Sequence, residues 1–213
     1  MQQIKFLKLA TLVFCFLFLF CLKTASASAA EYYVAPTGND SNIGSFGAPW
    51  KTLQKAENSV TAGDTIFMRG GTYALGDSFV NWNNAGTAGN PITVRNYPGE
   101  TPIITGSGGN SGGIYFYTPA AYIVIDGLEI TSATPYSMYG MGIFSHNATH
   151  DITIRNCYIH DIKAAQAGAI HTKRQASETG GTYNWIIENN HISNIQYVGG
   201  LETGGEHGIY ISS

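Results

Sequence analysis

The chain has 213 residues and a formal net charge of −3 at pH 7, from 11 Lys and Arg and 14 Asp and Glu. Only 12% of the residues are charged, whereas 26 are Gly and 13 are Tyr. The acidic balance argues against broad nucleic-acid binding, and the composition favours many short strands joined by tight turns.

Residues 1–30 have the pattern of a secretory signal peptide. Lys5 and Lys8 precede an apolar run over residues 9–22, and small residues over 24–30 follow. The run is shorter than the ~20 residues that span a bilayer, which favours cleavage over a retained anchor. We therefore expect a secreted, extracellular protein with no membrane contact after cleavage. Its formal charge is −6, because 8 basic and 14 acidic residues remain.

Residues 31–73 are predicted to form an N-terminal cap. Strands are expected over residues 31–36 and 65–69, and residues 50–60 between them are predicted to form an amphipathic helix. The apolar residues on one face of that helix are Trp50, Leu53, Ala56 and Val60. One such helix can cover the strand edges exposed at the end of a parallel stack.

One short pattern recurs in the second half of the chain. Residues 122–130, 151–159 and 184–192 align without a gap as strand, bend and strand, with apolar residues alternating at period two. The bend positions are Gly127, Asn156 and Asn189, residue types that tolerate a left-handed backbone. A fixed pattern with variable spacers is typical of a solenoid, so residues 74–213 are predicted to be its rungs.

A second column of strands can be set in register with this repeat. Its inward positions, each preceded by Gly or Ala, are Ile114, Ile143, Ile170 and Ile209. In the first two rungs the offset to the repeat is the same eleven residues. No strand follows eleven residues after Ile209, so we expect the coil to continue beyond this sequence.

Four segments resemble the opening of secreted proteins of the pectate-lyase-like superfamily. They are residues 32–40, 49–56, 62–73 and 89–106. The resemblance covers nearly all of the chain after the signal peptide. It implies an all-β fold, a right-handed parallel β-helix (solenoid) with an N-terminal capping helix. The resemblance says less about which reaction the protein catalyses, because that superfamily contains lyases, hydrolases, epimerases and non-catalytic surface proteins.

Alignment of the rungs distinguishes charged residues with a structural role from candidate site residues. Arg95, Asp126, Arg155 and Glu188 share one column just before the bend. Their signs alternate on rungs ~4.8 Å apart, which favours a structural charge ladder over catalysis. Cys157 is the single cysteine after residue 30, and we expect it to be buried and structural.

The outward positions of the second column form a strip suited to the apolar faces of sugar rings. It comprises Tyr115, Phe144, His171 and Tyr210, followed two residues further on by Tyr117, His146, Lys173 and Ser212. The predicted substrate-binding residues are Tyr115, Tyr117, Phe144, His146 and Tyr210. The alternative is that covering loops bury the strip as a secondary core.

Catalysis is predicted on the rung that two lengthened spacers bracket, residues 175–181 and 196–206. Cleaving a uronate polymer by β-elimination needs a base and a cation that disperses the growing negative charge. Lys173 is the candidate base, with Arg174 lowering its pKa, and His171 is the second candidate. The resemblance implies a lysine or arginine base, often with Ca²⁺. The chain lacks a tight Asp cluster, so no metal ligands are assigned.

Three functions remain open. The first is a lyase that cleaves an acidic polysaccharide such as pectate or alginate. The second is a non-catalytic glycan-binding or surface protein, for which the aromatic strip suffices. The third is a glycoside hydrolase, which needs paired carboxylates that loop residues Glu178, Glu202 or Glu206 could supply. Each implies a polysaccharide partner and no nucleic acid, and we expect a monomer.

Overall fold

The computed structural model describes residues 29–107, 110–117, 119–132, 139–146, 148–173, 181–197 and 207–211. The signal peptide predicted over residues 1–30 therefore lies almost entirely outside the described residues. Within the described part, no helix has the length and apolar character needed to cross a membrane.

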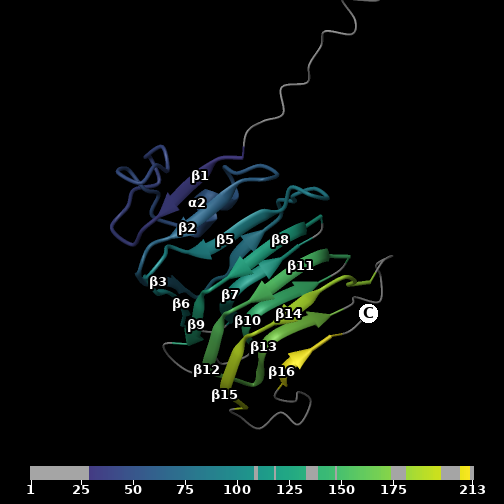
Figure 1. The fold of residues 1–213 in the computed structure, drawn as a ribbon. Coiled ribbons are helices and arrows are strands. Elements are labelled where there is room, and N and C mark those ends of the chain that lie inside the picture. The colour runs from purple at the N-terminus through teal and green to yellow at the C-terminus, as the bar shows by residue number, and fades with distance from the viewer. Residues whose placement is uncertain are drawn as a thin grey trace, which may run out of the picture.

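The strands form three parallel sheets, and each turn of the coil adds one strand to each sheet (Figure 1). The first sheet contains, in order, β1 (Glu31–Val34), β2 (Thr65–Met68), β5 (Ile92–Asn96), β8 (Ala121–Asp126), β11 (His150–Arg155) and β14 (Ile186–Glu188). The second contains β3 (Gly71–Gly76), β6 (Pro102–Gly106), β9 (Glu129–Ser132), β12 (Tyr158–Ala164) and β15 (His191–Tyr197). The third contains β4 (Val80–Trp82), β7 (Asn110–Phe116), β10 (Tyr139–His146), β13 (Gln166–Lys173) and β16 (His207–Tyr210). The prediction of an all-β parallel solenoid is confirmed.

The predicted register is confirmed in all three sheets. In the first, Ile125 pairs with Val94 and Ile154, and in the second Ile159 pairs with Ile130 and Ile192. In the third, Ile143 pairs with Ile114 and Ile170, and Ile170 pairs with Ile209. Ile209 is nevertheless 48% exposed, because it lies in the edge strand β16.

The bends after β8, β11 and β14 of the first sheet have the left-handed backbone that the sequence predicted. Gly127, Asn156 and Asn189 have φ of 73°, 54° and 53°. Two further left-handed columns were not predicted. One begins the same strands, at Tyr122, Asp151 and Asn184, and the other interrupts the second sheet, at Asp161 and Asn194. Three of these five residues are Tyr or Asp, so the columns do not show the uniform Gly and Asn pattern that identified the first.

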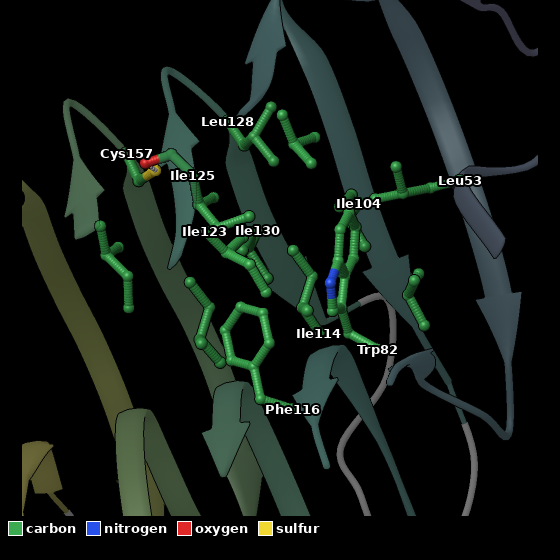
Figure 2. Close-up of a cluster of buried hydrophobic side chains, with 14 of the residues drawn as sticks. Leu53, Trp82, Ile104, Ile114, Phe116, Ile123, Ile125, Leu128, Ile130 and Cys157 are labelled. Carbon is green, nitrogen blue, oxygen red and sulfur yellow. Dashed lines mark hydrogen bonds between the residues drawn. The ribbon is translucent and has the colours of Figure 1, made fainter. Parts of the chain in front are cut away.

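The interior of the coil is filled by apolar side chains from all three sheets. Figure 2 shows Ile104, Ile123 and Ile130 together with the larger rings of Trp82 and Phe116. Each is at most 1% exposed, and complete burial of one such side chain contributes about 1.5–3 kcal/mol. This continuous core holds the strands of the third sheet, and therefore its outer face, in fixed positions.

The helix predicted over residues 50–60 is shorter than expected, because α2 spans Leu53–Glu57. Trp50 lies outside it in extended backbone. Its N–H donates to the Tyr33 carbonyl at 2.9 Å, and its carbonyl accepts from the Ala35 N–H at 2.9 Å. The buried face was predicted correctly, since Trp50, Leu53, Ala56 and Val60 are all buried. Residues 31–73 also contribute β1 and β2 to the first sheet.

The column of charged residues adopts the predicted register, with Asp126 between Arg95 and Arg155, and Glu188 beyond Arg155. Among these four described residues one ion pair forms, from Arg155 Nη2 to Asp126 Oδ2 at 3.1 Å. Arg95 instead lies with its guanidinium 6.0 Å from the ring centroid of Phe67. Of the ion pairs predicted between neighbouring rungs of this column, the one between Asp126 and Arg155 is therefore confirmed.

Candidate functional site

The outer face of the third sheet carries the aromatic strip that the sequence predicted. Phe144 is in register with Tyr115 on one side and His171 on the other, and His171 with Tyr210. The successive ring centroids lie 4.9, 5.5 and 4.8 Å apart. Because parallel pairing repeats one strand position on every rung, the rings form a continuous row along the coil.

Tyr117 and Phe79 widen and lengthen this row. The Tyr117 ring centroid lies 3.9 Å from that of Tyr115, and the Phe79 centroid 5.6 Å from it. Phe79 directly precedes Val80, which pairs with Ile114 of the inward column. The sequence analysis missed Phe79 because β4, with three residues, is too short to show a period of two.

Small residues before the inward isoleucines allow the rungs of the third sheet to approach closely. A Cβ built on Gly113 would lie 2.3 Å from the carbonyl oxygen of Gly142. A Cβ on Gly142 would lie 2.6 Å from the carbonyl oxygen of Ala169. Glycine at positions 113 and 142 is therefore required by the close approach of the neighbouring backbone.

The catalytic candidates lie at the end of β13. His171 is half-buried between Phe144 and Tyr210, and its neighbour Thr172 is fully buried. Lys173 is the last residue of the strand and occupies the register position beside His146. For Lys173 and His146 the structure describes the backbone and not the side chain.

Several predicted residues fall outside the described part of the chain. They are Arg174, Ser212 and the loop carboxylates Glu178, Glu202 and Glu206. Within the residues that are described, no group of three or more His, Cys, Asp and Glu side chains is arranged to hold a metal ion. The expectation of Ca²⁺ rests on the family resemblance alone.

A second polar cluster, which the sequence analysis did not single out, lies on the second sheet. The imidazole of His160 contacts two carboxylates, Asp161 Oδ2 at 2.6 Å from Nδ1 and Glu129 Oε1 at 3.1 Å from Nε2. The hydrogen bond with His160 holds the pKa of Asp161 below its usual range. Tyr158 stacks on His160 with centroids 3.9 Å apart. This cluster and the aromatic strip lie on different sheets.

Comparison with known proteins places the chain in a family. Residues 32–205 match the family described as "Pel9A-like, right handed beta helix region". A pectate lyase of Emericella nidulans, PEL9, is 35% identical over 143 residues, which cover 61% of this chain and 34% of that protein. Pectate lyase L of Dickeya dadantii is 30% identical over 175 residues, which cover 76% of this chain and 37% of that protein.

Among solved structures, the lacto-N-biosidase of glycoside hydrolase family GH136 from Eubacterium ramulus is similar in fold. Its TM-score is 0.62 at 19% identity, over 78% of this chain and 34% of that one. This chain thus spans 34% and 37% of the length of the two pectate lyases that it resembles. The match of the family model extends over most of the chain and agrees with the three-sheet coil and its register. The chain therefore belongs to the Pel9A-like family of right-handed parallel β-helix proteins.

Proposed function

We propose that this protein is a secreted lyase that binds an acidic polysaccharide along the third sheet and cleaves it by β-elimination. The observation that carries the proposal is the continuous row of rings from Tyr115 through Phe144 and His171 to Tyr210. Sugar rings present apolar C–H faces that pack on aromatic side chains. A row of rings along the coil axis suits a linear polymer. The names of the two pectate lyases support a polymer of uronic acids.

In the proposed reaction, a base removes the proton from the carbon next to the carboxylate. The electron pair of that C–H bond forms a carbon–carbon double bond, and the bond to the glycosidic oxygen breaks. The electron pair of the broken bond stays on that oxygen, which takes a proton from water. We assign the base to Lys173, which lies two residues beyond the ring of His171 in β13. Arg174 would lower the pKa of Lys173 and stabilise the negative charge that develops on the carboxylate. His171 is the alternative base, and its contacts with Phe144 and Tyr210 also suit a stacking role.

A binding role without catalysis is the second candidate. The strip alone supports it, because stacking on aromatic rings requires no acid, base or metal. Under this proposal Lys173 supplies a positive charge for a carboxylate and takes no proton.

Ultraviolet absorbance of the unsaturated product distinguishes these functions. The secreted protein is incubated with polygalacturonate and with alginate, each in Ca²⁺ and in a chelator, while binding is measured in parallel. We expect absorbance to rise on one polymer and to vanish in Lys173→Ala with binding retained. Binding of a uronate polymer without product would favour the second candidate. Absence of both on every uronate polymer would overturn the proposal.

A pair of aromatic variants tests the strip itself. Phe144→Ala removes the ring between Tyr115 and His171, whereas Tyr158→Ala removes a 37% exposed ring from the second sheet. We expect Phe144→Ala to weaken polysaccharide binding roughly tenfold, since one stacked aromatic contact contributes about 1.5 kcal/mol. Tyr158→Ala is the matched control. Equal binding by the two variants would remove the strip as the binding surface.

A further inference from the structure

A pocket of about 720 Å³ lies at the N-terminal end of the coil. Its walls come from Lys51 and Thr52, from α2, from β3 and from the segment that leads into β4. Pockets that bind small molecules span about 300–1,000 Å³, so this one has room for a sugar unit. None of the predicted site residues lines it.

The polar side chains of the pocket differ in whether they already have protein partners. The Gln54 amide is hydrogen-bonded to the backbone of Asn81, and the Tyr73 hydroxyl donates to backbone carbonyls within the core. The Lys51 ammonium makes no ion pair, and the Asn58 carboxamide no hydrogen bond, with any residue that the structure describes. The pocket therefore has fixed walls, and the side chains of Lys51 and Asn58 are among the groups available to a ligand.

One charged side chain lines the pocket, and the Asp40 carboxylate lies next to it, accepting from the N–H groups of Lys51 and Thr52 at 2.8 and 2.9 Å. Lys51 is the single charged residue among those that line it, all of which belong to the described part. It is also exposed, so its ammonium is accessible from solvent. A carboxylate is the natural partner for such a group, with hydroxyls as partners for Asn58.

Phe79 joins this pocket to the aromatic strip. Its side chain is half-buried, lines the pocket and contacts Tyr115, with centroids 5.6 Å apart. Gly112 permits this approach, since a Cβ there would lie 2.4 Å from Cε1 of Phe79 and 1.9 Å from the Met141 carbonyl oxygen. A polymer that follows the row of rings toward the N-terminal end therefore reaches the pocket.

We propose that the pocket binds one uronic acid unit of the polysaccharide that lies on the strip. The carboxylate of that unit contacts the Lys51 ammonium, its hydroxyls contact Asn58, and its apolar face packs on Phe79. The identity of the polymer rests on the proposed function, whereas the positions of the pocket and of Lys51 do not. The binding surface then extends from the third sheet onto the cap.

Binding of polygalacturonate by calorimetry tests this site. Lys51→Ala should weaken binding roughly tenfold, as expected for loss of one charge-assisted hydrogen bond. The matched control is Lys55→Ala on α2, because Lys55 lies 5.8 Å from the Trp50 ring centroid and does not line the pocket. With fully methyl-esterified polygalacturonate, which has no carboxylates, the effect of Lys51→Ala should disappear.

A second variant blocks the pocket without removing a proposed contact. Ser78 is exposed and lines the pocket, so Ser78→Trp fills it and should weaken binding to a similar extent. If Lys51→Ala and Ser78→Trp bind normally while Phe144→Ala is weakened, the pocket proposal is wrong and the strip stands. If binding is weakened only in Lys51→Ala and Ser78→Trp, the proposal that the strip binds the polymer is wrong and the pocket proposal stands. If Lys51→Ala and Lys55→Ala weaken polygalacturonate binding equally, the effect comes from the overall charge of the protein. That result would overturn the pocket proposal.

Discussion

The side chain of Gln54 is paired with the backbone of Asn81 by two hydrogen bonds. Its Nε2 donates to the Asn81 carbonyl at 2.9 Å, and its Oε1 accepts from the Asn81 N–H at 2.8 Å. Asn81 is the middle residue of β4, the edge strand of the third sheet. Glu57 continues the pattern, since its Oε1 accepts from the N–H groups of Asn83 and Asn84 at 2.9 Å. Side chains of helix α2 thus bond backbone groups at the edge of the sheet, where a further strand would otherwise bond them.

Gln54→Met keeps the size of the side chain and removes both of its hydrogen bonds with Asn81. We expect the free energy of unfolding to fall by about 1–3 kcal/mol, because two partly buried backbone groups lose their partner. Urea denaturation measures this change. Lys55→Met on the same helix is the control, expected to stay within about 0.5 kcal/mol of the unaltered protein. Equal stability of both variants would mean that Gln54 does not close the edge.

Asn156 combines a left-handed backbone, with φ of 54°, and a hydrogen bond from Nδ2 to Asp126 Oδ1 at 2.8 Å. Asn156→Ala loses both advantages and should cost about 2 kcal/mol or more, since a left-handed alanine alone costs about 1–2 kcal/mol. Asn156→Gly loses the hydrogen bond without the backbone strain, so its stability should lie between the other two. The order of the three denaturation midpoints is the test, and identical midpoints for Ala and Gly would exclude backbone strain.

Asp126 and Arg155 should contribute unequally to stability. The Arg155 side chain is 40% exposed, so Arg155→Met should cost about 1 kcal/mol or less, and added salt should diminish the difference. Asp126 is 6% exposed and accepts from Arg155 and from Asn156. Asp126→Ala should therefore cost more, about 1–3 kcal/mol. Denaturation at low and high salt measures both changes, and a larger loss in Arg155→Met than in Asp126→Ala contradicts the assignment.

Cys157 is 1% exposed, and burial raises the pKa of its thiol to about 11. The thiol should react with a disulfide reagent only when the protein unfolds, because the thiolate is the reactive form. In the unfolded chain a thiol ionises near pH ~8.5, so the unfolded state loses its proton first as pH rises. Stability from this group is complete below that pH and declines as pH approaches about 11.

The control for that pH dependence is Cys157→Ala, which has no ionisable group. It should be less stable at neutral pH because it leaves a small cavity beside Ile125 and Leu128, yet its stability should fall less steeply at alkaline pH (Figure 2). Denaturation midpoints of both proteins across this range give the result. Parallel decline in the two proteins would assign the alkaline loss to other groups.

Much of the fold could be predicted because the same local solution recurs on successive rungs. The spacing of Ile114, Ile143 and Ile170 predicted one sheet, and Gly127, Asn156 and Asn189 predicted the bends that the structure confirms. A strand has a period of two, so an inward isoleucine places its neighbour outward. That rule alone was sufficient to place Tyr115, Phe144, His171 and Tyr210 in one row.

Features that do not recur from rung to rung were determined by the tertiary structure. Trp50 belongs to a helical pattern in sequence, but its backbone groups bond to Tyr33 of β1 and to Ala35, and α2 begins only at Leu53. Phe79 joins the strip and the pocket forms because α2, β3 and β4 meet, although no repeat relates those segments. The sequence by itself determined which residues face inward or outward on each rung, because that depends on local alternation. Contacts at the N-terminal end of the coil depend on segments distant in the chain, so only the folded structure determined them.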